Sequence, residues 1–239
     1  MLRITLIMTF LVIFFIISIP IYIFEWIAGK ININIRHKTS YYIVSHAFKI
    51  VLFIAGTHIT VTGRENIPKD TPVLYVGNHN SYFDIVVSGS VIPYPTGYVS
   101  KKEMKMVPFL HLWMVLINCL FIDRDDPRQG LKTILKGIDN IKAGISMFIF
   151  PEGTRSKDGT MGHFKEGSMK MAQKSGCPVI PVAFTNTSAL FEKQFPRVKS
   201  VDVTLEFGKP IYTDKLSKEE QKALGAKCKE EIQKMLDKK

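Results

Sequence analysis

The stretch Asn78-His-Asn-Ser-Tyr-Phe-Asp84 follows the apolar run Pro72-Val-Leu-Tyr-Val76 and a single glycine. The run is short, apolar and closed by that glycine, a pattern typical of a buried strand. Ser81 then precedes the apolar residues of a predicted helix, so His79 lies in the turn and Asp84 in the first helical turn. Turns at strand ends are where α/β sheets hold ligands. An Asp there accepts a bond from one imidazole nitrogen and leaves the other as a base.

The same stretch has an alternative interpretation as a helix cap. Ser81-x-x-Asp84 resembles a capping box, with a serine as the N-cap and an acidic residue three positions later. In that case Asp84 satisfies only backbone amides, and His79 is an ordinary loop histidine. The rest of the chain has to distinguish these two interpretations.

Composition and charge restrict the class of protein. The chain has 239 residues and is 46% hydrophobic, enough to bury one good core, and its formal charge of +11 calls for an anionic partner. The 21 residues from Ile4 to Phe24 carry no charge. As a helix they would extend about 31 Å, close to the thickness of a bilayer core. No small-x-small cleavage site follows, so we expect a retained membrane anchor rather than a signal peptide. We do not expect nucleic acid as a partner, because the positive charge is dispersed.

Charges around this run predict its orientation and the division of the chain. Lys30, Arg36 and Lys38 follow it, whereas Arg3 alone precedes it, so the positive-inside rule places the main domain on the cytoplasmic face of the cell membrane. A second apolar stretch, residues 41–55, is shorter and suits a helix that lies in the interface or covers the core. The two stretches either include a true span or form a hairpin within one leaflet. We therefore expect anchoring helices over residues 1–56 and one further domain over residues 57–239.

After residue 57, strand-like and helix-like patterns alternate. The predicted strands are 58–61, 73–76, 96–99, 119–122, 146–150, 179–183 and 201–207, and the predicted helices are 81–90, 102–115, 128–143, 167–175 and 217–238. This order predicts a single α/β domain with a largely parallel mixed sheet flanked by helices, preceded by an apolar N-terminal helix or helical hairpin.

Three further turns carry charged residues that suit an anionic ligand. Phe150-Pro-Glu-Gly-Thr-Arg155 follows a predicted strand; its glycine allows close backbone approach, and its arginine suits phosphate. The pair Asp123-Arg124 ends another strand, and Lys165 precedes a predicted helix, where anions are favoured. Each turn alone has an ordinary explanation as a surface ion pair or a solvated lysine. Together with His79 and Asp84 on one sheet, they indicate a site.

The ordered set of motifs resembles that of the glycerolipid acyltransferases, and most closely the bacterial 1-acylglycerol-3-phosphate acyltransferases. The resembling segments are Asn-His-x-Ser-x-x-Asp at residues 78–84, Phe-Ile-Asp-Arg at 121–124, Phe-Pro-Glu-Gly-Thr-Arg at 150–155 and Val-Ile-Pro-Val-Ala at 179–183. The resemblance covers about residues 58–210 and implies an acyltransferase catalytic domain. The chain departs from the family pattern at Asn118, where relatives often carry Gly or Lys. The resemblance therefore implies the type of reaction more firmly than the choice of acceptor.

The resemblance implies transfer of a fatty acyl group from an acyl thioester to the sn-2 hydroxyl of lysophosphatidate, giving phosphatidate in phospholipid biosynthesis. His79 matches the general base and Asp84 the residue that orients it. The residues expected to bind the acceptor are Asp123, Arg124, Glu152, Gly153, Thr154 and Arg155, which lie in the matching motifs, together with Lys165, which we add. Expected partners are an anionic membrane surface, lysophosphatidate and the co-substrate, acyl-CoA or acyl-carrier protein. The other histidines lack ligand spacing, so we expect no metal and no other cofactor.

Other functions remain open at this point. The chain could act on glycerol 3-phosphate or another lysolipid, or it could be a membrane-anchored hydrolase that forms an acyl-serine at Ser81. A catalytically silent lipid-binding protein would have the same anchor but would not need His79. A requirement for His79 in acyl transfer separates the last class from the enzymes.

Overall fold

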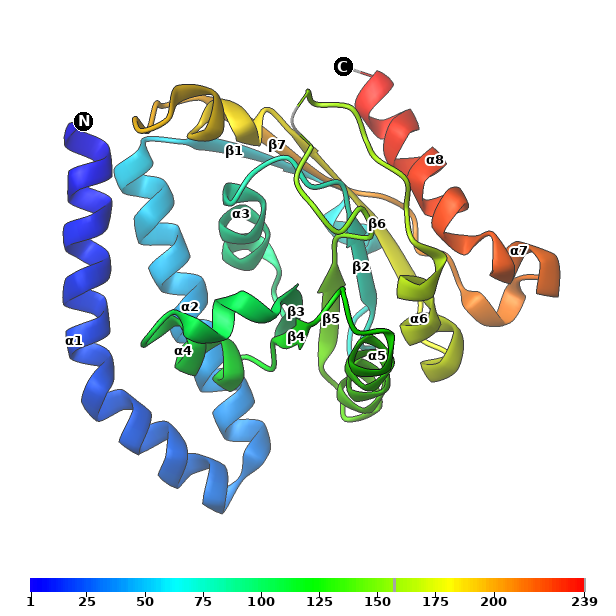
Figure 1. Cartoon of the computed structure of the whole chain (residues 1–239), viewed down its shortest axis with the longest axis horizontal. Coiled ribbons are helices and arrows are strands. Elements are labelled where there is room, and N and C mark those ends of the chain that lie inside the picture. Colours follow the sequence, from blue (N-terminus) through cyan, green and yellow to red (C-terminus); the bar gives the residue numbers. More distant parts are fainter. Residues whose placement is uncertain (157, 239) are drawn as a thin grey trace.

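A seven-stranded sheet forms the centre of the computed structural model, which describes residues 1–156 and 158–238 (Figure 1). Its strands are β1 His58–Thr62, β2 Leu74–Gly77, β3 Thr96–Lys101, β4 Leu120–Ile122, β5 Ser146–Ile149, β6 Val179–Thr185 and β7 Asp202–Phe207. They lie in the order β1-β7-β6-β2-β5-β3-β4, with only β6 and β7 antiparallel to each other. The predicted α/β fold with a largely parallel mixed sheet is therefore confirmed.

The sheet register brings the charged turns together. β2 and β5 are parallel neighbours, with Val76 opposite Ile149, and β3 joins β5 to β4 in the same direction. The carboxyl ends of β2, β4 and β5 therefore lie at one edge of the sheet. The turns that contain His79, Asp123 and Glu152 follow these three strand ends.

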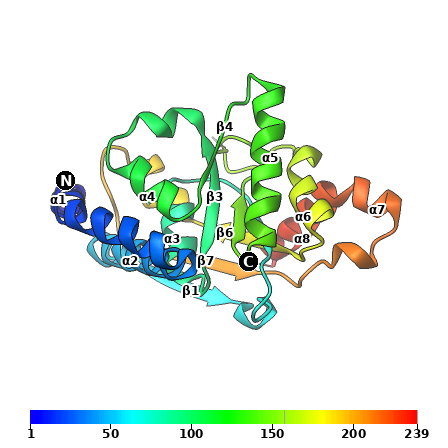
Figure 2. The same ribbon diagram turned by 90° about the horizontal axis from the view of Figure 1, so that it is seen from below.

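Helices cover both faces of the sheet (Figure 2). One face packs against α2 Ile33–Ala55, α3 Phe83–Val91 and α4 Leu110–Leu116, and the other against α5 Pro127–Lys142, α6 Lys170–Ser175 and α8 Leu224–Asp237. A hydrophobic core lies on each face of the sheet, and successive side chains of β2 point into opposite cores. Tyr75 belongs to the core on the first face, and Leu74 and Val76 belong to the core on the second. Strands buried on both faces need continuous apolar sequence, which explains the apolar run before the turn that contains His79.

Three predicted helices are interrupted. The one expected over 102–115 consists of the 3-10 turn η2 Lys102–Met106 and then α4, because Pro108 disfavours helical backbone before it. The one expected over 217–238 is α7 Lys218–Lys222 and α8 Leu224–Asp237, separated at Ala223, and a capping box of Ser217 and Glu220 begins it. The one expected over 167–175 begins as the 3-10 turn η3 Glu166–Met169 before α6. The remaining 3-10 turns are η1 Arg64–Asn66, η4 Thr187–Ala189, η5 Glu192–Gln194 and η6 Thr213–Lys215.

The N-terminal 55 residues form a helical hairpin of α1 Leu2–Ile31 and α2. The Asn32 side chain caps α2 by accepting from the Asn34 amide. Pro20 lies inside α1, and Figure 1 shows that α1 bends along its length, as an internal proline favours. The buried side of α2 joins the core of the sheet, which agrees with its expected role in covering that core.

Helix α1 buries two polar side chains, Ser18 and Glu25. Buried Ser18 accepts a bond from the Trp113 indole, and buried Glu25 accepts bonds from Thr39 and Ser40. The exposed side is apolar and includes Val12, Ile13, Ile16, Ile17, Ile19, Ile23, Phe24, Trp26 and Ile27. Within the described residues, α1 is the one helix long and apolar enough to cross a membrane. A surface helix of a soluble protein normally exposes its polar side and buries its apolar side, whereas α1 exposes an apolar side.

Gly97 sets how closely β3 approaches the turn before β4. A Cβ at Gly97 would lie 2.3 Å from the carbonyl oxygen of Asn118, which is backbone and cannot rotate away. Gly97→Ala is therefore expected to destabilise the fold by about 1–3 kcal/mol or more. Gly130→Ala is the matched control, because a Cβ added at Gly130 in α5 would lie 3.8 Å from the Asp123 carbonyl oxygen, an ordinary van der Waals distance. This variant is expected to stabilise the fold by up to ~1 kcal/mol. Thermal unfolding in detergent measures both, and equal melting temperatures for the two variants would contradict the expectation.

Candidate active site

One oxygen of Asp84 holds the turn after β2. Oδ2 accepts bonds from His79 Nδ1 at 2.8 Å, from the Asn80 amide at 2.7 Å and from the Ser81 amide at 2.8 Å. Asp84 is fully buried, and its carboxylate lies in the first turn of α3, where the helix dipole favours negative charge. The structure thus combines the two interpretations, because the carboxylate that caps the helix also contacts the imidazole.

The His79 ring is fixed on two sides. Nδ1 faces Asp84, and the ring stacks on Phe150 with centroids 4.1 Å apart. A carboxylate only accepts hydrogen bonds, so the tautomer that satisfies it carries its proton on Nδ1 and a lone pair on Nε2. The side chain is 16% exposed, enough for a substrate to reach it. The pair can therefore act as an oriented general base.

Glu152 joins the turn after β5 to the turn after β2. Its Oε1 accepts the His79 amide at 2.7 Å, and its Oε2 accepts the Gly162 amide at 2.8 Å. The Ser156 amide in turn donates to the His79 carbonyl at 2.8 Å. Both Glu152 oxygens contact backbone donors, so in this structure the side chain positions His79. Its expected contact with substrate stays a prediction.

Two cations from different turns converge on Gly153. This glycine has a φ of +77°, and a Cβ added to it would lie 3.4 Å from Lys165 Nζ and 3.7 Å from Arg124 Cζ. Partial burial lowers the pKa of Arg124, but an arginine remains charged at neutral pH. The absence of a Cβ leaves backbone between the two cations open to a ligand. The sheet therefore brings together Arg124 and Lys165 as the sequence predicted.

Two further predicted residues, Asp123 and Arg155, are held by partners of their own. Asp123 accepts a bond from Lys102 Nζ at 2.7 Å, and Arg155 donates from one terminal nitrogen to Glu192 at 2.9 Å. Thr154 and Arg155 line a cavity of about 440 Å³. Among the residues that the structure describes, no group of three or more His, Cys, Asp or Glu side chains is placed to hold a metal ion.

Four residues of the site were absent from the sequence prediction: Tyr82, Lys102, Phe150 and Glu192. Tyr82 and Phe150 lie inside the quoted motifs, but their ring contacts have no sequence pattern. The Arg155 guanidinium lies 3.7 Å above the Tyr82 ring. Glu192 comes from η5, more than a hundred residues from the turn it contacts, and nothing in the sequence around it signals a role.

Comparison with known proteins agrees with this geometry. A family model described as acyltransferase matches residues 58–185. This chain belongs to the acyltransferase family. It is 32% identical over 200 residues to the 1-acyl-sn-glycerol-3-phosphate acyltransferase of Borreliella burgdorferi, covering 84% of this chain and 80% of that protein. It is 33% identical over 190 residues to the enzyme of the same name from Saccharomyces cerevisiae, covering 78% of this chain and 61% of that protein.

A solved structure shares the fold of this acyltransferase. The crystal structure of the 1-acyl-sn-glycerophosphate (LPA) acyltransferase PlsC from Thermotoga maritima has a TM-score of 0.74 and 26% identity. The match covers 95% of this chain and 93% of that one, so it includes the N-terminal helices. The family resemblance expected from the motifs is therefore confirmed. Both Glu192 and the hairpin lie outside the residues that the family model matches.

The ion pair between Lys102 and Asp123 changes the pKa of the Asp123 carboxyl group, and this change can be measured. The bond from Lys102 holds the pKa of Asp123 below its ordinary value. Its stabilisation is therefore fully present above the ordinary carboxyl pKa of about 4 and is lost as pH falls through the lowered pKa. Lys102→Met is expected to raise the Asp123 pKa, measured by NMR titration of carboxyl carbons. Lys234→Met, which removes a cation paired with Glu230 on α8, is the control. An unchanged Asp123 pKa in Lys102→Met would contradict the assignment.

Proposed function

We propose that this acyltransferase transfers a fatty acyl group from acyl-CoA or acyl-carrier protein to the sn-2 hydroxyl of lysophosphatidate, giving phosphatidate in phospholipid biosynthesis. The relatives' names support the reaction. The observation that carries the proposal is the 2.8 Å contact between the His79 imidazole and buried Asp84. It supplies an oriented base at the sheet edge where the cations gather.

The reaction proceeds by direct transfer. Nε2 of His79 takes the acceptor's hydroxyl proton as the oxygen attacks the thioester carbonyl, forming a tetrahedral intermediate. Asp84 stabilises the resulting imidazolium. The intermediate then collapses, the carbon–sulfur bond breaks and the thiolate leaves with its electron pair. Since free thiols have a pKa of about 8.5, this leaving group needs little acid assistance.

Cationic side chains hold the phosphate of the acceptor. Arg124 and Lys165 flank Gly153, and Arg155 presents its guanidinium from the same turn. Arginine and lysine form charge-assisted bonds with phosphate oxygens. Such binding fixes the acceptor hydroxyl near the base and makes the attack effectively unimolecular.

An acyl-serine route through Ser81 fits the geometry poorly. The Ser81 hydroxyl is buried, donates to Glu192 Oε2 at 2.7 Å and accepts the Phe83 amide at 3.0 Å. A nucleophilic serine needs its hydroxyl bonded to a base and open to substrate. The bonds of Ser81 instead support the beginning of α3, which favours direct transfer over a serine hydrolase.

Replacing His79 tests the proposed reaction. His79→Ala is expected to lower acyl transfer to lysophosphatidate about 10²- to 10⁴-fold, and Asp84→Asn at least about tenfold, because base and orientation are lost. Purified protein is assayed with acyl-CoA and with acyl-carrier protein, against glycerol 3-phosphate and other lysolipids as alternative acceptors. Near-normal turnover by His79→Ala would refute the mechanism, and release of free fatty acid without acceptor would indicate a hydrolase.

We further propose that α1 anchors the enzyme to the cell membrane, with the site on the cytoplasmic face. The exposed apolar side of α1 and the basic residues that follow it support this. In such an arrangement the lipid acceptor reaches the site from the bilayer.

Charge placed on the exposed side of α1 tests the anchor. The double variant Ile16→Asp and Ile23→Asp, at positions 62% and 60% exposed, is expected to lose most binding to phosphatidylcholine–phosphatidylglycerol vesicles in a flotation assay. Leu131→Asp with Leu135→Asp on α5, 54% and 52% exposed, is the control and is expected to bind normally. Equal binding by both double variants would rule out α1 as the anchor.

A further inference from the structure

Glu192 bonds to three groups of the site, although it lies outside every motif. Its Oε2 accepts the Ser81 hydroxyl at 2.7 Å, and its Oε1 accepts the Tyr82 amide at 2.8 Å. Oε1 also accepts a bond from Arg155 at 2.9 Å. One carboxylate therefore connects the turn that contains His79 with the turn that contains Arg155.

The Glu192 carboxylate is built into the beginning of α3. Asp84 accepts hydrogen bonds from the amides of Asn80 and Ser81. The Ser81 hydroxyl accepts one from the Phe83 amide, and Glu192 accepts one from the Tyr82 amide. Free amides and the dipole at a helix N-terminus both favour a carboxylate. Glu192 thus has a fixed place before it contacts Arg155, and it is not a loose counter-ion that an anionic ligand would displace.

Arg155 is held between Glu192 and the Tyr82 ring. Its Cζ lies 3.7 Å from the ring centroid, and its ion pair is partly buried, with side chains 33% and 22% exposed. A guanidinium has five N–H donors in a rigid fork. With one terminal nitrogen bonded to Glu192, the fork keeps a fixed direction and retains donors for a phosphate. Arg155 and Glu192 line the same cavity as Thr154.

We propose that Glu192 is a positioning residue that sets the direction of the Arg155 guanidinium relative to His79 and thereby the affinity for the anionic acceptor. This inference rests on the proposed function and deepens it by assigning a residue outside the matched family region. Because Glu192 acts through Arg155, its effect is on acceptor binding. None of the three hydrogen bonds described for Glu192 involves the ring of His79, the proposed base.

Steady-state kinetics of Glu192→Gln test the proposal. The glutamine keeps the size of the side chain but loses its charge, so the KM for lysophosphatidate is expected to rise about five- to tenfold. The turnover number, its pH profile and the KM for acyl-CoA are expected to stay within about twofold. Glu192→Asp keeps the charge and is expected to restore part of the affinity. Gln194→Ala, on the same turn, is the control and is expected to match the wild type.

A double-mutant cycle with Arg155 separates positioning from general stability. Arg155→Ala alone is expected to raise the acceptor KM, and adding Glu192→Gln is expected to change it less than about twofold further. If the effects of the two substitutions on the acceptor KM multiply, the two residues act independently and the proposal is overturned. A joint fall in turnover and donor affinity with a lower melting temperature would show a merely structural role and would also overturn it. Wild-type protein that transfers no acyl group to lysophosphatidate would refute the proposed function itself, a result distinct from either kinetic outcome.

Discussion

One carboxylate oxygen, Oδ2 of Asp84, makes the hydrogen bonds on which the geometry of the site depends. It accepts bonds from the His79 imidazole and from two amides of the turn between β2 and α3. All three donors meet Oδ2, whereas Oδ1 is buried without a hydrogen-bond partner. Burying a carboxylate is costly unless donors compensate it, so the turn has to keep the shape that brings these three donors together. The central position of β2 in the sheet makes that shape rigid, because both faces of the strand are packed. The geometry of the His79–Asp84 pair is thus a consequence of hydrogen bonding at the beginning of a helix that follows a buried strand.

Three carboxylates position a site proposed to bind an anion. Asp84 and Glu152 are bonded to backbone amides, and Glu192 is bonded to an amide, a hydroxyl and Arg155. Their charges are therefore compensated locally, which limits repulsion of a phosphate. Arg124 and Lys165, near Gly153, are proposed to supply the attraction. In this proposal the acidic residues give the site its shape, and the basic residues give it its affinity.

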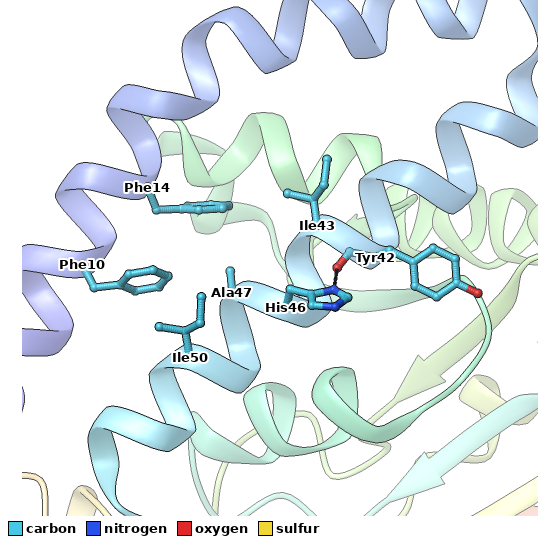
Figure 3. A pocket seen from close by; sticks show the side chains of 7 residues that line it. All are labelled: Phe10, Phe14, Tyr42, Ile43, His46, Ala47 and Ile50. Carbon is cyan, nitrogen blue, oxygen red and sulfur yellow. Dashed lines mark hydrogen bonds between the residues drawn. The ribbon is translucent and has the colours of Figure 1, made fainter.

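The hairpin combines polar contacts on its inner side with an apolar outer side. Ser18 and Glu25 of α1 bond inward to α4 and α2, and the exposed side of α1 is apolar. Figure 3 shows a small apolar pocket between the two helices, where Phe10 and Phe14 of α1 face Ile43, Ala47 and Ile50 of α2. Because α2 also packs on α3, the helix that follows the turn with His79 is supported by the hairpin.

The sequence by itself determined the α/β fold, the seven strands and the turns that carry His79, Asp84, Arg124 and Lys165, because burial and turn formation leave local patterns. It failed where one proline or one backbone kink divided a helix, at Pro108 and Ala223. Only the tertiary structure showed that both oxygens of Glu152 bind amides, that Tyr82 lies under Arg155, and that Glu192 reaches the turn. The Glu192–Ser81 contact joins residues 111 positions apart, and no local pattern encodes which distant side chain a fold will bring to a free amide.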